Sequence, residues 1–301
     1  MTTATPERTR RRVRVPHKGA ILALFLPFGI LFALFYLVPI GYAVWQSLLV
    51  VQRDGTFGQA SLVFGGLSQY VLVFQSEAFW TSVVRMLVFG IVQVPIMLGL
   101  ALLFALLLDS PLVRGRRFFR LAYFVPYAVP GVIAAIIWGS LLSPNLSPFT
   151  AITQNIDFLG ADLVLWSIAN VVTWVYAGYN MLIIYSSLLS IPTEIYEAAR
   201  LDGAGQFRIA WSIKIPLVRP AIILTAVFSI IGTLQLLAEP QVFRSFSSAV
   251  TSTFTPNMTV IATAAIPNTN LAAAFSVVLA LTTFVLSFGF LKYMQRKDKQ
   301  S

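Results

Sequence analysis

The chain has 301 residues, of which 57% are hydrophobic and 11% are charged, and its mean hydropathy is +0.81. A soluble domain carries about 25% charged residues, so this composition excludes an ordinary soluble protein and indicates a helical membrane protein. The lack of cysteine excludes a disulfide framework, thiolate chemistry and cysteine metal sites. The formal charge of +10 does not indicate nucleic-acid binding, because the basic residues gather at the ends of apolar runs.

Apolar runs long enough to cross a bilayer recur along the chain. The first, from Ala20 to about Trp45, is too long for a signal peptide and lacks a convincing cleavage site, so we expect it to be retained. The sequence predicts one transmembrane domain over 20–293, between a basic tail at 1–19 and a C-terminal tail at 294–301. The six expected spans are residues 20–48, 80–108, 118–142, 163–189, 218–238 and 271–293.

The distribution of basic residues predicts how these spans are oriented. Of the 21 Lys and Arg residues, 18 fall in the two tails and in the segments that join spans two to three and four to five. The opposite segments hold only Arg53, Arg85 and Arg244. Cytoplasmic segments carry the excess of positive charge, so both termini and the 190–220 loop are predicted to be cytoplasmic. The predicted outer loops are residues 49–79, 143–162 and 239–270.

The chain lacks the sequence features of an ATPase or a metalloenzyme. It contains no G-x-x-x-x-G-K-[ST] phosphate loop and no Gly-Lys pair, so it cannot bind ATP by that route. Its single histidine, His17, falls in the basic tail, where we expect it to be solvated. The sequence therefore predicts no catalytic residue, no metal site and no cofactor.

The most informative segment is the polar loop at 190–220, which lies between two apolar runs. Residues 194–200 favour a short helix, and Gly203 is a suitable stop after it. On such a helix Ile195 and Ala199 share one face, with Ala198 close by. Glu197 lies on the other side and offers a carboxylate that an arginine could bind in bidentate fashion. The loop therefore predicts a surface helix that packs closely against a partner.

This loop resembles the EAA loop of importer-type ABC transporter permeases in Glu197-Ala198-Ala199, Gly203 and Ile213-Lys214-Ile215-Pro216. The fuller run over 191–204 is similar to the carbohydrate-uptake branch, which includes permeases for maltose, glycerol phosphate, lactose and multiple sugars. The chain departs from the pattern at Ala210, where an aromatic residue is usual, with Trp211 beside it, and at Ile215, where leucine is commoner.

The resemblance implies an all-α polytopic integral membrane protein with six transmembrane helices and the type I ABC importer permease fold. It implies a bacterial cytoplasmic membrane location, a second and non-identical permease, two ATP-binding subunits that hydrolyse the ATP, and an extracytoplasmic solute-binding protein. The solute would be a carbohydrate or a related polyol, and nucleic acid is not expected as a partner. The residues implied to couple to the ATPase are Glu197, Ala198, Ala199, Asp202, Gly203 and Ala204.

Polar residues within spans four and five are the candidates for a solute pathway, because such groups usually face a cavity or a neighbouring helix. In span four, Tyr176 and Asn180 share a helical face with Thr173, and Tyr179 is adjacent. In span five, Ser229, Thr233 and Leu236 share a face. Gln235 and Glu239 form a further pair with i, i+4 spacing. The resemblance to maltose-type permeases places the solute near these spans. For each of these residues, interhelical hydrogen bonding or headgroup anchoring is the alternative to contact with solute. Glu239 could also seal a gate or contact the binding protein, and for Gln93 a packing role is favoured. The predicted pathway residues are Tyr176, Tyr179, Asn180, Ser229, Thr233, Gln235, Leu236 and Glu239.

Three alternatives are left open. A permease of the same family for glycerol 3-phosphate, or for another non-sugar solute, would favour an arginine near the pathway, such as Arg85 or Arg244. An ion-driven secondary transporter would need ionisable residues near the middle of a span, and only Arg85 comes close. A membrane enzyme would need catalytic groups within the spans, which contain no His, no Cys and no paired carboxylates.

Overall fold

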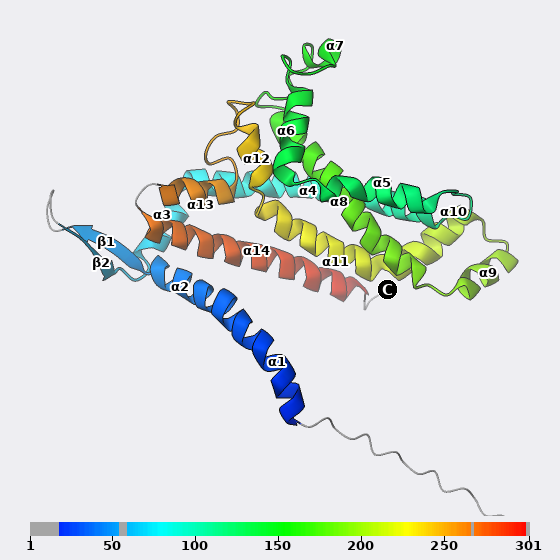
Figure 1. Ribbon diagram of the computed structural model, residues 1–301, viewed down its shortest axis with the longest axis horizontal. Coiled ribbons are helices and arrows are strands. Elements are labelled where there is room, and N and C mark those ends of the chain that lie inside the picture. Colours follow the sequence, from blue (N-terminus) through cyan, green and yellow to red (C-terminus); the bar gives the residue numbers. More distant parts are fainter. Residues whose placement is uncertain (1–17, 54–58, 266–267, 299–301) are drawn as a thin grey trace, which may run out of the picture.

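The computed structural model describes residues 18–53, 59–265 and 268–298 (Figure 1). Almost all of the predicted basic tail, with His17, lies outside these residues. In chain order the elements are α1 (Lys18–Phe32), η1 (Ala33–Leu37), α2 (Val38–Ser47), β1 (Leu49–Arg53), β2 (Ala60–Phe64), α3 (Ser68–Gln75), α4 (Glu77–Asp109), α5 (Arg116–Ala128), α6 (Gly131–Leu142), α7 (Thr150–Thr153), α8 (Val164–Leu189), α9 (Thr193–Leu201), α10 (Gln206–Ile209), η2 (Ala210–Lys214), α11 (Ile215–Leu234), α12 (Ala238–Phe243), α13 (Pro256–Ala265) and α14 (Thr269–Asp298).

Five helical segments among the described residues are long and apolar enough to span a membrane, and the pair α5 and α6 supplies a sixth candidate. The sixth differs from our expectation of one helix over 118–142, because α5 and α6 meet at an angle of 94°. The break falls at Val129 and Pro130, whose backbones are extended. A residue before proline disfavours the helical conformation, and proline has no N–H to donate.

The first span, α1 through α2, projects away from the other helices (Figure 1), and none of its most apolar stretch is buried within the chain. It joins the bundle only near its end, where Asn270 Nδ2 on α14 donates to Gln46 O (3.0 Å) and to Gln46 Oε1 (2.8 Å). Its π-helical turn η1 ends two residues before Pro39, and η2 likewise ends two residues before Pro216. A proline ring would clash with the carbonyl group four residues earlier in a regular α-helix. The π-helical turns η1 and η2 therefore lie where the helix must widen before Pro39 and Pro216.

The core is built around the long helices α4 and α8. One cluster of buried side chains, which includes Phe89, Ile168 and Phe243, packs α4, α8 and α12 together with α6. A second cluster joins α4, α8 and α11 through small and branched residues such as Ala105 and Leu188. α9 and α10 lie at one end of the bundle, on the right in Figure 1, and α14 runs toward that end.

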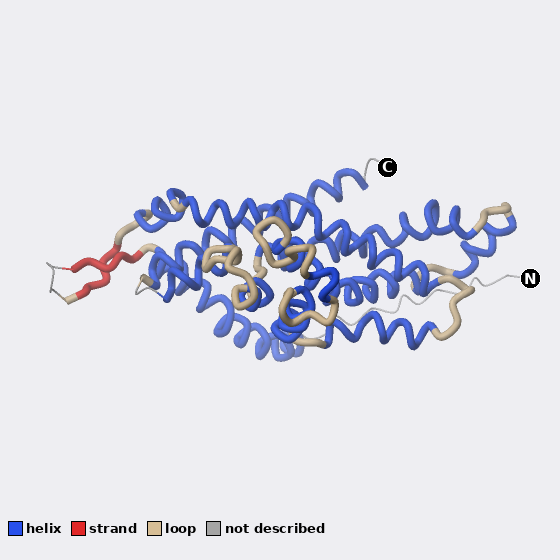
Figure 2. The backbone as a smooth tube through the Cα atoms, turned by 90° about the horizontal axis from the view of Figure 1, so that it is seen from above, coloured by secondary structure: helices blue, strands red, loops and turns tan. Residues whose placement is uncertain are grey.

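All three predicted outer loops contain regular structure that the sequence did not predict, and the loop at 143–162 holds the short helix α7. Residues 49–79 hold the antiparallel hairpin β1–β2, with Leu49 opposite Phe64, followed by α3. Residues 239–270 hold α12 and α13. The loops that follow α6 and α12 lie on the same face of the bundle (Figure 2), where Ser247 Oγ donates to Leu159 O.

At the end of the chain, helix α14 extends into the predicted C-terminal tail at 294–301. α14 runs on to Asp298, five residues beyond the predicted end of the last span. Arg296 and Lys297 lie in its last turn, where positive charge interacts favourably with the helix dipole. The helix therefore continues beyond the end of the apolar run.

Candidate coupling helix and solute pathway

The short helix predicted in the polar loop is confirmed as α9, which ends before Gly203. Gly203 has a φ of 78°, a left-handed conformation that glycine adopts without a steric penalty. Ala204 N donates to Ala199 O (2.9 Å), and Gly203 N donates to Arg200 O (3.0 Å). These two bonds form the Schellman motif, which satisfies carbonyl groups left free at the end of a helix. The loop thus fixes both the length of α9 and the direction in which the chain leaves it.

Most of the predicted coupling residues are exposed on the outside of α9 and its C-terminal turn. Glu197, Ala198, Asp202 and Gly203 are exposed, whereas Ala199 and Ala204 are half-buried. Because Ala199 faces the body of its own chain more than Ala198 does, the two alanines are not equally available to a partner.

Beyond α9, the structure exposes two aromatic side chains that the sequence reading had not placed in the coupling surface as a pair. Phe207 is 82% exposed and Trp211 is 67% exposed. Their rings are stacked, with centroids 6.4 Å apart. Their i, i+4 spacing could have revealed this pair, together with the departure from the family pattern at Ala210. They extend the exposed apolar surface from α9 toward η2.

Two of the predicted pathway residues, Tyr176 and Tyr179, form an aromatic cluster with a third tyrosine that the prediction had not included. Tyr127, in the last turn of α5, stacks on Tyr179 with centroids 4.6 Å apart. It meets Tyr176 edge to face at 5.9 Å. Tyr127 and Tyr176 are each 38% exposed, so the cluster presents ring surface that a ligand could reach. The position of Tyr127 could not be predicted from the sequence, because the nearby Pro126 and Pro130 indicate a bend in the chain but not its direction.

The cluster depends on a close approach of the α5 backbone to α8 at Gly178. A Cβ atom at Gly178 would lie 1.7 Å from Tyr123 O and 3.2 Å from Phe124 Cα. Both are main-chain atoms, so they could give way only if α5 moved as a unit. Glycine at this position is therefore what lets Tyr127 reach across to the tyrosines of α8.

Glu239 contributes a carboxyl group beside this cluster. It is 5% exposed and lies in the first turn of α12. Its Oε1 is 2.8 Å from where a Cβ on Gly131 would stand, and α12 packs against both α6 and α8. Glu239 therefore faces the junction of α5, α6 and α8.

The predicted grouping of residues in span five needs correction, because α11 ends at Leu234. Gln235 and Glu239 do not share a helical face, and Leu236 lies beyond the face that holds Ser229 and Thr233. Gln235 is exposed, and its carbonyl accepts from Asn257 Nδ2 (2.7 Å). This bond satisfies a carbonyl at the helix end. Leu236 is 7% exposed and belongs to the apolar core.

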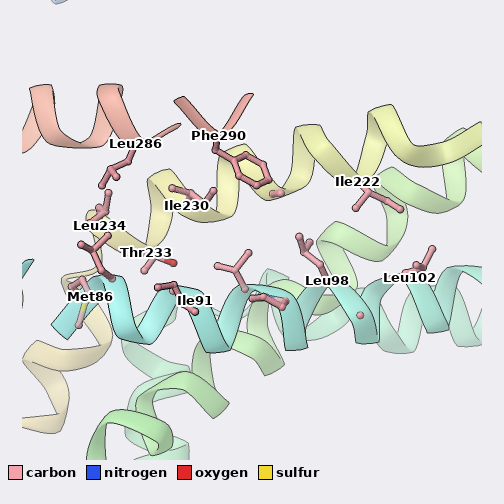
Figure 3. Close-up of a pocket in the computed structure, with 16 residues that line it drawn as sticks. Met86, Ile91, Leu98, Leu102, Ile222, Ile230, Thr233, Leu234, Leu286 and Phe290 are labelled. Atoms are coloured by element: carbon pink, nitrogen blue, oxygen red, sulfur yellow. The ribbon is translucent and has the colours of Figure 1, made fainter. Parts of the chain in front are cut away.

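Thr233 lines an apolar groove between α4, α11 and α14, shown in Figure 3, with a volume of about 730 Å³. Its methyl group lies close to Gly90, 3.1 Å from where a Cβ would stand. Apart from Thr233, the lining side chains are apolar or are glycine. A sugar needs several hydrogen-bonding partners, so this groove is unsuited to it. Ser229 is half-buried on the same helix.

Asn180 and Gln93 serve to join helices. Asn180 is 3% exposed, and its Nδ2 donates to Tyr176 O (3.1 Å) on its own helix and lies 3.7 Å from Met97 Sδ on α4. Gln93 Nε2 on α4 donates to Thr173 Oγ1 on α8 (3.2 Å). The structure therefore places Asn180 within the contact between α4 and α8, away from the exposed ring surface of the tyrosines.

This arrangement of helices is the fold of an ABC importer permease. A chain of a bacterial ABC transporter involved in the import of the polysaccharide alginate matches it with a TM-score of 0.76 at 19% identity, covering 93% of this chain and 96% of that one. The chain belongs to the family described as binding-protein-dependent transport system inner membrane component, whose model matches residues 79–299. It is thus a multi-pass permease subunit of a binding-protein-dependent ABC importer in the cytoplasmic membrane, which confirms the resemblance found in the polar loop.

Curated relatives belong to several uptake systems. The sn-glycerol-3-phosphate transport system permease protein UgpA of Yersinia pseudotuberculosis is 34% identical over 204 residues, 65% of this chain and 67% of the relative. The lactose transport system permease protein LacF of Rhizobium radiobacter is 29% identical over 262 residues, 82% of this chain and 86% of the relative. The diacetylchitobiose uptake system permease protein NgcF of Streptomyces coelicolor is 26% identical over 300 residues, 93% of this chain and 84% of the relative.

Proposed function

We propose that this chain, together with a second permease, forms the pathway for a neutral sugar or a related polyol. A solute-binding protein would deliver the solute at the outer face. Two ATP-binding subunits would bind and hydrolyse ATP and move the permeases through α9, so this chain itself would perform no chemistry. The names of the lactose and diacetylchitobiose relatives support a carbohydrate.

The observation that carries the sugar assignment is the cluster of Tyr127, Tyr176 and Tyr179 beside the carboxyl of Glu239. Tyrosine rings offer an apolar face to the C–H groups of a sugar, and their hydroxyls offer hydrogen bonds at the edge. A buried carboxyl group accepts hydrogen bonds from sugar hydroxyls and fixes their orientation. A specific small-molecule site typically combines a mostly apolar and aromatic surface with a small number of well-placed polar groups.

Glycerol 3-phosphate is the second candidate, because UgpA is 34% identical to this chain. Two features of the structure disfavour it. A phosphate near Glu239 would place two acidic groups in one site, which is costly. Arg85, one of the two arginines that the sequence offered for a phosphate, donates from Nη1 to Phe254 O (2.8 Å) and lies over the Phe254 ring at 4.5 Å.

The proposed contact with the ATPase uses the exposed surface of α9. A carboxylate such as Glu197 is available to an arginine of the partner, and Ala198 permits close approach. A rigid-body movement of the ATPase would then carry α9 with it and shift the permease between inward- and outward-facing states.

Uptake by the complete transporter tests this function. The chain would be reconstituted in vesicles with the second permease, the two ATP-binding subunits and the binding protein. ATP-driven accumulation of a radiolabelled mono- or disaccharide is expected, with sn-glycerol 3-phosphate failing to accumulate or to compete. Accumulation of glycerol 3-phosphate alone would reject the sugar assignment. Uphill transport by the chain without any ATPase would reject the permease mechanism and favour the secondary transporter.

The orientation of the chain has its own test, because the natural sequence contains no cysteine. The excess of basic residues predicts that both termini and α9 face the cytoplasm. Single cysteines at positions 10 and 206 should therefore resist an impermeant thiol reagent in intact cells, whereas one at position 150 should react. The opposite pattern of labelling would overturn the proposed topology.

A further inference from the structure

An ion pair joins two segments that are far apart in the sequence. Lys214 Nζ, at the end of η2, donates to Asp109 Oδ2, in the last residue of α4, at 2.5 Å. The side chains are 9% and 13% exposed, respectively. The pair therefore lies between the end of α4 and the start of α11, close to the loop that bears α9.

Tyr196 brings α9 into the same cluster. The ammonium of Lys214 lies 5.0 Å from the centroid of the Tyr196 ring, within the range of a cation–π interaction. Tyr196 and Ala199 are the half-buried residues of α9, and the other residues of the helix are exposed. Burial, and secondarily the carboxylate of Asp109, raises the pKa of the Tyr196 hydroxyl, so the phenol stays neutral. The inner face of α9 therefore rests on the ion pair.

Helix stability does not account for this cluster. Asp109 places a negative charge at the C-terminal end of α4, where the helix dipole disfavours it. Removing two charges from water is also costly, and a well-packed apolar pair would often be at least as stable. In addition, the hydroxyl oxygen of Tyr196 is buried with no hydrogen-bond partner among the described residues. What the cluster does provide is a fixed geometry between three segments.

The local structure directs Lys214 toward Asp109. The π-helical turn η2 widens the helix over residues 210–214, immediately before α11. Such a turn changes the direction in which the following side chains point, and π turns occur often at functional sites. Lys214, the last residue of η2, is 7% exposed although it is a lysine in a polar loop.

We propose that Asp109, Lys214 and Tyr196 form a clamp that makes α9 move as one body with the end of α4 and the start of α11. The proposal rests on the proposed function, in which an ATPase displaces α9. With the clamp intact, that displacement passes directly to two core helices of the permease. Without it, α9 can be displaced while α4 and α11 stay behind. The three residues are positioning residues and need not touch solute or ATPase.

The ratio of solute transported to ATP hydrolysed tests the clamp in the complete reconstituted transporter. Lys214→Met and Asp109→Asn should each lower this ratio about tenfold, as expected when a coupling element is lost. The amount of ATPase that copurifies should stay unchanged. The exchanged pair Asp109→Lys with Lys214→Asp should restore much of the ratio, because it rebuilds the attraction and places a cation at the end of α4. Lys292→Met, which removes an exposed lysine on α14, is the matched control.

Tyr196 has two diagnostic substitutions. Tyr196→Phe keeps the ring over Lys214 and should keep the coupling ratio, whereas Tyr196→Leu should lower it. An unchanged ratio in both Lys214→Met and Asp109→Asn would overturn the clamp. Loss of copurifying ATPase in these variants would also overturn it, by assigning the pair to docking.

A distance measurement tests the clamp without reference to activity. Spin labels can be attached uniquely at Leu107→Cys on α4 and Arg200→Cys on α9, because the chain has no other cysteine. The clamp predicts one narrow distance distribution that does not change when the complete transporter binds ATP, and a broadened one in Lys214→Met. A narrow distribution in both proteins would contradict the proposal. Failure of wild-type uptake would instead reject the proposed function, whatever the spin labels show.

Discussion

The proposed coupling surface and the aromatic cluster differ in how they are assembled. The proposed coupling surface lies on one short helix and its capping turn, within twelve consecutive residues from Thr193 to Ala204. The aromatic cluster joins Tyr127, Tyr176 and Tyr179 with Glu239, from three helices separated in the sequence. A local surface tolerates changes elsewhere in the fold, whereas an assembled site depends on every contact that brings its helices together. We therefore expect the proposed coupling surface to be disrupted by substitutions that change its charge, and the aromatic cluster by substitutions that disturb helix packing.

The largest effect is expected where packing builds the aromatic cluster. Gly178→Ala would force a Cβ against Tyr123 O and Phe124 Cα, and overpacking of this kind costs about 1–3 kcal/mol. We expect a lower melting temperature in detergent and loss of solute uptake, because α5 must move away from α8. Gly99→Ala is the control, since no atom lies within 4 Å of its added Cβ. Equal stability of the two variants would show that α5 does not approach α8 this closely.

Reversing a charge on α9 should abolish uptake without affecting the fold. Glu197→Lys replaces an exposed carboxylate with a cation, so an arginine on the ATPase would be repelled where it was attracted. We expect the permease to insert and purify normally, with uptake lost and ATPase association weakened. Copurification and vesicle uptake measure the two effects. Glu194→Lys makes the same change of charge one turn away on the same helix. Normal uptake by Glu197→Lys would remove Glu197 from the proposed coupling surface.

Removal of one ring should weaken solute handling to a moderate degree. Tyr179→Ala deletes the partner that stacks on Tyr127, and an aromatic pair is worth about 0.5–1.5 kcal/mol beyond its buried area. We expect the concentration for half-maximal uptake to rise up to about tenfold, with ATPase association unchanged. Tyr179→Phe keeps the ring and should stay near wild type. If Tyr179→Ala transports with unaltered concentration dependence, the cluster is not the solute site.

The smallest effect is expected for Asn180, which the sequence had placed in the pathway. Its Nδ2 contacts Tyr176 O and Met97 Sδ within the contact of α8 with α4. Interhelical hydrogen bonds in membranes average about 0.6 kcal/mol, so Asn180→Leu should lower the melting temperature slightly. Solute affinity should be unaltered, as measured by competition between sugars for uptake. A change in which sugar is preferred would return Asn180 to the pathway.

The sequence predicted the helix α9 and its capping turn in detail because their determinants are local. Helix-forming residues precede a glycine that takes φ = 78°, and both features can be recognised from adjacent positions. The end of α11 was not predicted, because apolar residues continue past Leu234 and the donor to Gln235 O is Asn257, 22 residues further on. The bend at Pro130 was indicated by the residue type, but its angle of 94° was not.

The sequence by itself determined that this protein spans a membrane, which apolar runs are long enough to form spans, and where the short helix α9 lies. These properties depend on the length of apolar runs, on helix-forming residues and on a capping glycine, all of which act over one or two helical turns. Only the tertiary structure decided that Tyr127 joins Tyr176 and Tyr179, that Asn180 packs between helices, and that Asp109 pairs with Lys214. Such contacts depend on the angles at which whole helices meet, and those angles come from packing across the chain.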